Sequence, residues 1–114
     1  MGFSLDSLDR SGKQSEDYER LSYTVSAMTA LRKVIRAADL PRRTDEGEVL
    51  WTLSVNDELV VTPAQSSWLA ERLRNADREK IQADDPEPEE LLAMVDELAA
   101  FCVRCARSGG FRVT

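Results

Sequence analysis

The chain has 114 residues, a formal net charge of −6 at pH 7, 42% hydrophobic and 32% charged side chains, two cysteines and no histidine. This length and composition are typical of one soluble globular domain, and the lack of histidine excludes Ser-His-Asp or Cys-His nucleophiles and imidazole-ligated zinc. Residues 1–43 carry 8 basic and 6 acidic side chains (+2), whereas residues 44–114 carry 7 basic and 15 acidic ones (−8), so we expect no binding of nucleic acid or anionic membranes.

The first forty residues predict one strand and one helix. Met1–Asp9 partly alternates between apolar and polar side chains, as a short strand does, and ends at the turn-forming pair Ser11-Gly12. After a polar stretch without a clear period, apolar residues recur at steps of three and four, which predicts a helix from Ser22 to Ala38. Pro41 cannot donate a helix hydrogen bond and is expected to end this helix.

Residues 49–62 favour a β-hairpin. Val49–Val55 is rich in residues that suit a pleated strand, and Glu58–Thr62 forms a second short strand beyond a tight turn at Asn56-Asp57. Within such a hairpin Trp51 is expected in the core, because tryptophan is highly buried on average. A short apolar run of this kind also fits a buried helical segment, so both alternatives stay open.

A second helix is predicted to follow directly. Thr62–Gln65 combines an N-cap, a proline at the first helical position and a capping box. The helix should run to about Lys80. Its inward side chains would be Leu69, Leu73 and Ala76, and its outward ones Arg72, Arg74 and Arg78.

The end of the chain predicts a third helix and a last strand. Asp84–Glu90 carries five carboxylates and two prolines, which is typical of a stiff linker, and its acidic end suits the first turn of a helix. Gly109-Gly110 should end that helix, and Phe111–Val113 can pair as a short strand. The apolar stripe of the third helix consists of Leu91, Met94, Val95, Leu98, Phe101, Cys102 and Cys105.

Two motifs that resemble functional sites are better explained as structural. Cys102 and Cys105 form a Cys-x-x-Cys, but they fall deep in a helix near its C-terminal end, where the dipole disfavours a thiolate, and no further Cys or His completes a zinc site. Ser7–Gly12 resembles the start of a calcium loop, yet Ser7 and Tyr18 stand where that loop needs acidic ligands. We therefore predict no metal ligand, no cofactor and no catalytic residue.

Charged and aromatic residues supply the candidates for partner binding. Arg32 and Arg36 lie one turn apart on the first predicted helix, and Arg42 and Arg43 follow directly, so they could bind phosphate or an acidic protein. Trp68 is set off the apolar stripe by one residue and would be a hot-spot side chain if it were exposed. The Asp84–Glu90 run could in turn bind a basic partner, although such runs are usually only solvated.

Five segments together resemble a known group of proteins. Met1–Leu5, Tyr18–Arg20, Ala27–Arg32, Val61–Ala64 and Phe101–Val113 resemble small uncharacterised proteins of actinobacteria and their phages. The resemblance implies a single compact α+β unit of bacterial or phage origin in the cytosol. No activity is assigned to that group, so no functional residue carries over.

The sequence thus predicts one α+β domain over residues 1–114, with three helices on a small, mainly antiparallel sheet. No signal peptide and no membrane span are expected, which points to the cytoplasm and reduced thiols. The expected function is that of an acidic, non-enzymatic protein acting by protein–protein interaction, as a regulator, antagonist or immunity-type partner. Its partner is another protein or a second copy in a homodimer. The alternative is a small-molecule binder or an enzyme that uses carboxylates and arginines.

Overall fold

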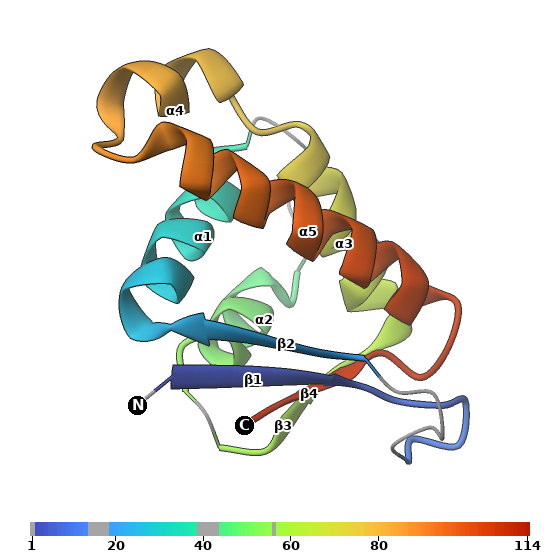
Figure 1. Ribbon diagram of the computed structural model, residues 1–114. Helices are drawn as coiled ribbons and strands as arrows, with labels where there is room; N and C mark the ends of the chain where they lie inside the picture. Colours follow the sequence, from blue (N-terminus) through green and yellow to red (C-terminus); the bar gives the residue numbers. More distant parts are fainter. Residues whose placement is uncertain (1, 14–18, 39–43, 56) are drawn as a thin grey trace.

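The computed structural model describes residues 2–13, 19–38, 44–55 and 57–114, and Figure 1 shows their arrangement. These residues form an α+β fold in which the strands build one antiparallel sheet of order β2-β1-β4-β3. The strands are β1 (Gly2–Ser7), β2 (Arg20–Thr24), β3 (Leu59–Val61) and β4 (Phe111–Val113). The helices are α1 (Val25–Ala37), α2 (Glu46–Thr52), α3 (Pro63–Arg74), α4 (Arg78–Asp84) and α5 (Pro88–Ala106).

The period-2 pattern of the strands gives the sheet one buried face. Phe3 lies opposite Tyr23, and Leu5 lies opposite Val113, and all four side chains are buried. The alternate positions, which include Ser4 on β1, point to the other face and are mainly polar. Helices α1, α2, α3 and α5 lie on the apolar face, while α4 lies at the end of the molecule away from the sheet (Figure 1).

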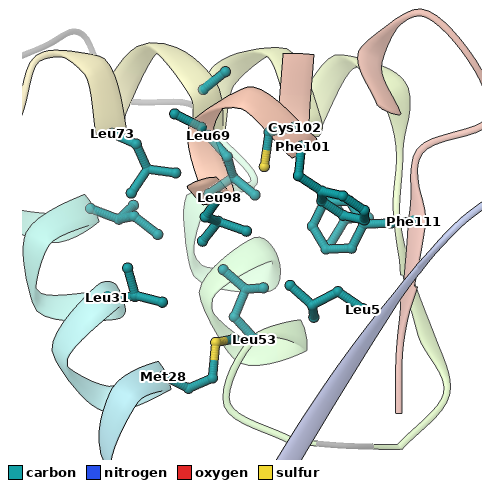
Figure 2. Close-up of a cluster of buried hydrophobic side chains, with 14 of the residues drawn as sticks. Leu5, Met28, Leu31, Leu53, Leu69, Leu73, Leu98, Phe101, Cys102 and Phe111 are labelled. Carbon is teal, nitrogen blue, oxygen red and sulfur yellow. The ribbon is translucent and has the colours of Figure 1, made fainter. Parts of the chain in front are cut away.

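The core joins side chains from α1, α2, α3, α5 and the sheet (Figure 2). The rings of Phe101 on α5 and Phe111 on β4 meet edge to face, with their centroids 5.3 Å apart. Cys102 lies beside them as a small apolar side chain. The predicted stripe of the third helix is therefore confirmed as its core-facing side, with Met94 only partly buried.

Two glycines connect α5 to β4, and both lie very close to the backbone of neighbouring segments. The Gly109 amide donates to the Leu8 carbonyl at 2.9 Å, and a Cβ at Gly109 would lie 1.7 Å from the Asp9 carbonyl oxygen. Gly110 has a φ of 80°, and a Cβ there would lie 2.0 Å from the Val61 carbonyl oxygen. The predicted helix stop at these glycines is confirmed, and the close approach explains why no larger residue fits.

Several predicted boundaries were wrong. The Ser22 end of the first predicted helix belongs to β2, and α1 begins after Thr24, whose Oγ1 accepts a hydrogen bond from the Ala27 amide at 3.1 Å. Pro41 lies outside the described residues. The second predicted helix begins at Thr62 with the expected capping box but ends at Arg74, and a separate helix follows. The described residues therefore contain five helices, not three.

The predicted hairpin is also wrong in its first half. Residues 46–52 form α2, because Val49, Leu50 and Leu53 at helical spacing reach the core together. The second half of the hairpin is confirmed as strand β3, which pairs with β4 and not with residues 49–55. No helix in the described ranges is long and apolar enough to cross a membrane.

Candidate functional site

A groove lies between α1 and α4 and continues to the start of α5; we call it the α1–α4 groove. It consists of two adjoining hollows of about 470 Å³ and about 300 Å³. The two hollows share Ser26, Ala30, Asp85 and Leu91 as lining residues, so they form one continuous depression. Their volumes fall within or at the lower limit of the range of roughly 300–1,000 Å³ that is typical of ligand sites.

The α1 wall of the groove is a second face of that helix. Met28, Leu31 and Ile35 face the core and are fully buried. The groove face carries mostly short side chains, which leave the space unfilled, at steps of three and four. It consists of Ser26, Thr29, Ala30, Lys33, Val34 and Ala37.

The opposite wall is α4, which is weakly attached to the rest of the molecule. The Asp77 carboxylate caps this helix by accepting a hydrogen bond from the Lys80 amide at 3.0 Å. No residue of α4 is buried, and Ile81 alone is half-buried against the core. The Arg78 guanidinium donates to both carboxylate oxygens of Asp96 on α5, at 2.9 and 3.2 Å, which ties α4 to α5.

One end of the groove is acidic. Asp85, Glu87 and Glu90 line the second hollow, and the Asp85 carboxylate accepts a hydrogen bond from the Glu87 amide at 2.9 Å. A hydrogen bond with Glu87, and then repulsion from Glu87 and Asp85, raise the pKa of Glu90 above its ordinary value. No lysine or arginine of the described chain forms an ion pair with these three carboxylates. Within the described part of the chain, these carboxylates are therefore not paired with a cation.

The other hollow is mixed in charge. Lys33 from α1 and Lys80 from α4 line it together with Asp77 and Asp84. The groove thus has a direction, from the purely acidic end near the start of α1 to the mixed end near its C-terminus. Among the described residues, no group of three or more acidic or cysteine side chains is placed to hold a metal ion.

The predicted arginine cluster is only partly visible. Arg32 donates to the Leu53 carbonyl at 2.9 Å and to the Thr29 hydroxyl at 3.3 Å, so it joins α1 to the end of α2. Burial, and then repulsion from Arg36, lower the pKa of Arg32. Arg36 is exposed, and Arg42 and Arg43 lie outside the described residues. Neither Arg32 nor Arg36 lines the α1–α4 groove.

The expectation that Trp51 lies in the core was wrong, and the exposure on which the Trp68 hot spot depended is not found. Trp68 is 8% exposed and packs in the core, whereas Trp51 is 61% exposed on α2. The Arg72 guanidinium carbon lies 5.4 Å from the centroid of the Trp68 ring. The Trp68 indole N–H is buried and has no hydrogen-bond partner in the described chain. Trp68 is therefore not available as a surface hot spot in this conformation.

Arg72 was expected to face solvent and is instead 1% exposed. Its Nε donates to the Ile35 carbonyl at 3.1 Å, and its Nη2 donates to the Glu46 carboxylate at 3.3 Å. Arg72 thus links α3 to the end of α1 and to the first turn of α2. Its role is structural, because a buried guanidinium needs such acceptors.

Both cysteines are buried and free of disulfides. Burial raises the pKa of both thiols, that of Cys105 to about 12. A thiol with a raised pKa carries little reactive thiolate at neutral pH, which supports the structural interpretation of the Cys-x-x-Cys.

The Asp9 turn also reads as structural. Asp9 accepts hydrogen bonds from the Ser11 amide and hydroxyl and from the Lys13 amide, as a turn residue does. These contacts account for the motif that resembled a calcium loop.

Sequence reasoning found the acidic run but missed the groove. The signal for the groove was the set of short side chains on one face of α1, which no predicted element was expected to cover. The opposite wall could not be placed, because a single helix was predicted where α3 and α4 are separate. In comparisons with known proteins, the chain matches no family model, no curated protein and no solved structure.

Proposed function

We propose that the chain is a non-enzymatic interaction protein that binds a basic, partly apolar segment of another protein in the α1–α4 groove. The observation that carries this proposal is the acidic end of a groove whose floor is apolar. The floor is formed by Ala27, Ala30, Leu91 and Met94, and Asp85, Glu87 and Glu90 stand along its edge. An apolar floor supplies affinity by burial, and the carboxylates supply attraction for a cationic partner and selection against an anionic one.

The unequal charge of the molecule supports a basic partner. The acidic excess of residues 44–114 includes the Asp84–Glu90 run at the groove, and such a field raises the rate of encounter with cations. A regulator, antagonist or immunity-type protein of the cytoplasm would work in this way, by occupying a basic surface of its target. A second copy of the chain remains a candidate partner, since the exposed Arg36 offers a basic side chain.

A small-molecule site is the second candidate, and the volume of the groove favours it. Small ligands are usually oriented by a few buried polar groups. The charged residues of the larger hollow, Lys33, Asp77, Lys80 and Asp84, are exposed. These exposed charges suit the rim of a protein interface better than the interior of an enzyme site.

The test removes the charge of the acidic end without changing its shape. The groove variant carries Asp85→Asn, Glu87→Gln and Glu90→Gln, and Asn at 85 can still accept the hydrogen bond from the Glu87 amide. The control variant carries Glu48→Gln, Asp57→Asn and Glu71→Gln, which remove the same charge from exposed positions outside the groove lining.

Both variants are measured against peptides selected by the native chain from a random peptide-display library. We expect the selected peptides to be rich in Lys or Arg beside apolar residues, and to bind the groove variant roughly tenfold more weakly. The control variant should bind them as the native chain does. Equal loss in both variants, or selected peptides without basic residues, would show that the groove is not the binding site.

A further inference from the structure

The shape of the α1–α4 groove constrains the backbone of its occupant. Both walls are helices, and neither presents the row of free N–H and C=O groups that a strand edge offers. An extended segment laid on this floor would lose water from its own backbone groups and find no strand edge to replace it. A helical segment satisfies its backbone groups internally, so it can bury one face here without that loss.

The short side chains and the length of the α1 wall also suit a helix. Ala30 and Ser26 are short, and helix axes approach to about 8–10 Å when the side chains at the contact allow it. The lining of α1 extends from Ser26 to Ala37, which is about 16 Å at 1.5 Å per residue. An occupant helix of about three turns covers this length.

The charges of the groove give the occupant a direction. The end near Ala27 holds Asp85, Glu87 and Glu90, whereas in the other hollow Lys33 and Lys80 balance Asp77 and Asp84. A helix N-terminus carries a partial positive charge and a C-terminus a partial negative one. The N-terminal end of the occupant is therefore attracted to the acidic end, and its C-terminal end lies in the balanced hollow, away from the three carboxylates.

We infer that the α1–α4 groove takes an amphipathic helix of about three turns that lies parallel to α1, with its N-terminal, lysine- or arginine-bearing end against Asp85, Glu87 and Glu90. This inference rests on the proposed function and names the form of the bound segment. The occupant presents apolar residues at helical spacing to Ala30, Val34 and Leu91.

Three synthetic peptides of about 12 residues and equal composition test this inference. The forward peptide has leucines at helical spacing and lysines in its first turn, the reversed peptide has its lysines in the last turn, and the alternating peptide has the leucines at every second position. Binding is measured by fluorescence anisotropy with the native chain and with the groove variant. Lysines in the first turn oppose the dipole of the free helix, so the affinities are corrected for the helicity of each free peptide, measured by circular dichroism. After this correction we expect the forward peptide to bind roughly threefold more tightly than the reversed one and tenfold more tightly than the alternating one.

The outcomes separate the two proposals. An alternating peptide that binds as tightly as the forward one, and loses affinity in the groove variant, overturns the helix but upholds the proposed function. A forward peptide that binds the native chain and the groove variant equally, or does not bind the native chain, counts against the proposed function itself. Circular dichroism of the groove variant shows that its fold is intact.

Site-directed cross-linking tests the direction independently. Ser26→Cys and Ala37→Cys place a thiol at either end of the groove, where the native residues are exposed. A forward peptide with an activated disulfide at its N-terminus should label Ser26→Cys, and one activated at its C-terminus should label Ala37→Cys. The opposite pattern overturns the direction. The native chain is the control, because Cys102 and Cys105 are buried and should remain unlabelled.

Discussion

At the scale of single residues, the two tryptophans lie in opposite environments, Trp68 in the core and Trp51 on the surface. Trp68 adjoins the Leu69 stripe, and it is buried because α3 contacts both α1 and α5, so that more than one of its faces is covered. Trp51 belongs to a short helix that uses Val49 and Leu50 for its inner face and turns the indole outward. A single sequence shows the period of a helix but not how many neighbours cover it.

The two tryptophans provide a matched pair of substitutions. Trp68→Ala should lower the free energy of unfolding by about 3–5 kcal/mol, because it removes a buried ring and leaves a cavity. Trp51→Ala should change it by no more than about 0.5 kcal/mol, because the side chain is largely in solvent. Urea unfolding followed by far-UV circular dichroism measures both without relying on the fluorophore that each variant loses. Similar losses in the two variants would contradict the burial assignments.

At the scale of secondary-structure elements, the sequence predicted the elements with the longest periodic patterns and missed those set by tertiary contacts. The helix with the Leu91–Cys105 stripe, the capping box at Thr62 and the strand at residues 111–113 were all confirmed. The β-rich composition of residues 49–55 was overridden, because a helix there delivers Val49, Leu50 and Leu53 to one side. The break at Asn75, where α3 ends in its C-cap, carries no glycine or proline to mark it.

The attachment of α4 predicts its local stability. This helix buries no side chain and is tied to α5 by the exposed ion pair between Arg78 and Asp96, and such pairs contribute about 0–1 kcal/mol. Its amides should therefore exchange with solvent at least roughly tenfold faster than those around Leu98 in α5. Hydrogen–deuterium exchange followed by NMR measures this difference directly.

The variant Arg78→Ala tests whether the ion pair with Asp96 stabilises α4. It should speed exchange in α4 and leave α5 unchanged, since the ion pair is the contact that it removes. Protection of α4 equal to that of α5 would mean that α4 is part of the core unit. An occupant in the groove should slow the exchange of α4, because it would contact Lys80 and Ile81.

At the scale of the whole molecule, the fold class and the single α+β arrangement of sheet and helices could be predicted from composition and pattern, but the candidate site could not. The site combines α1 with α4 and the start of α5, which are about fifty residues apart in the chain. The acidic run was visible in the sequence, but its position beside the α1–α4 groove was not, because that depends on which helix it faces. The predicted arginine sites at Arg32 and Arg36 stay predictions, with Arg32 already engaged by the Leu53 carbonyl.

The charge of the groove predicts how partner binding depends on pH. A cationic segment binds the ionised carboxylates, and the pKa of Glu90 is raised by Glu87, so binding must release a proton where Glu90 is partly protonated. Affinity should therefore fall as the pH drops through this raised pKa and stay constant between about pH 7 and 8, because the chain has no histidine. Calorimetry in buffers of different ionisation enthalpy detects the released proton.

The variant Glu87→Gln checks the cause of this pH dependence. It removes the neighbour that contributes most to the raised pKa of Glu90, so the fall in affinity should begin at a lower pH. A midpoint that stays in place would assign the titration to another group. High salt should weaken binding at every pH, since the carboxylates of the rim are exposed and screened.

The place of β4 in the sheet has a consequence for how the chain is made. Strand β3 pairs with β4, and β1 also pairs with β4, so residues 111–113 join the two halves of the sheet. During translation, residues 59–61 emerge about fifty residues before the strand that receives them. The sheet therefore closes only after Val113 has left the ribosome, and until then β3 has no partner strand, whereas β1 can already pair with β2. The four-stranded sheet can therefore be completed only after β4 has been synthesised.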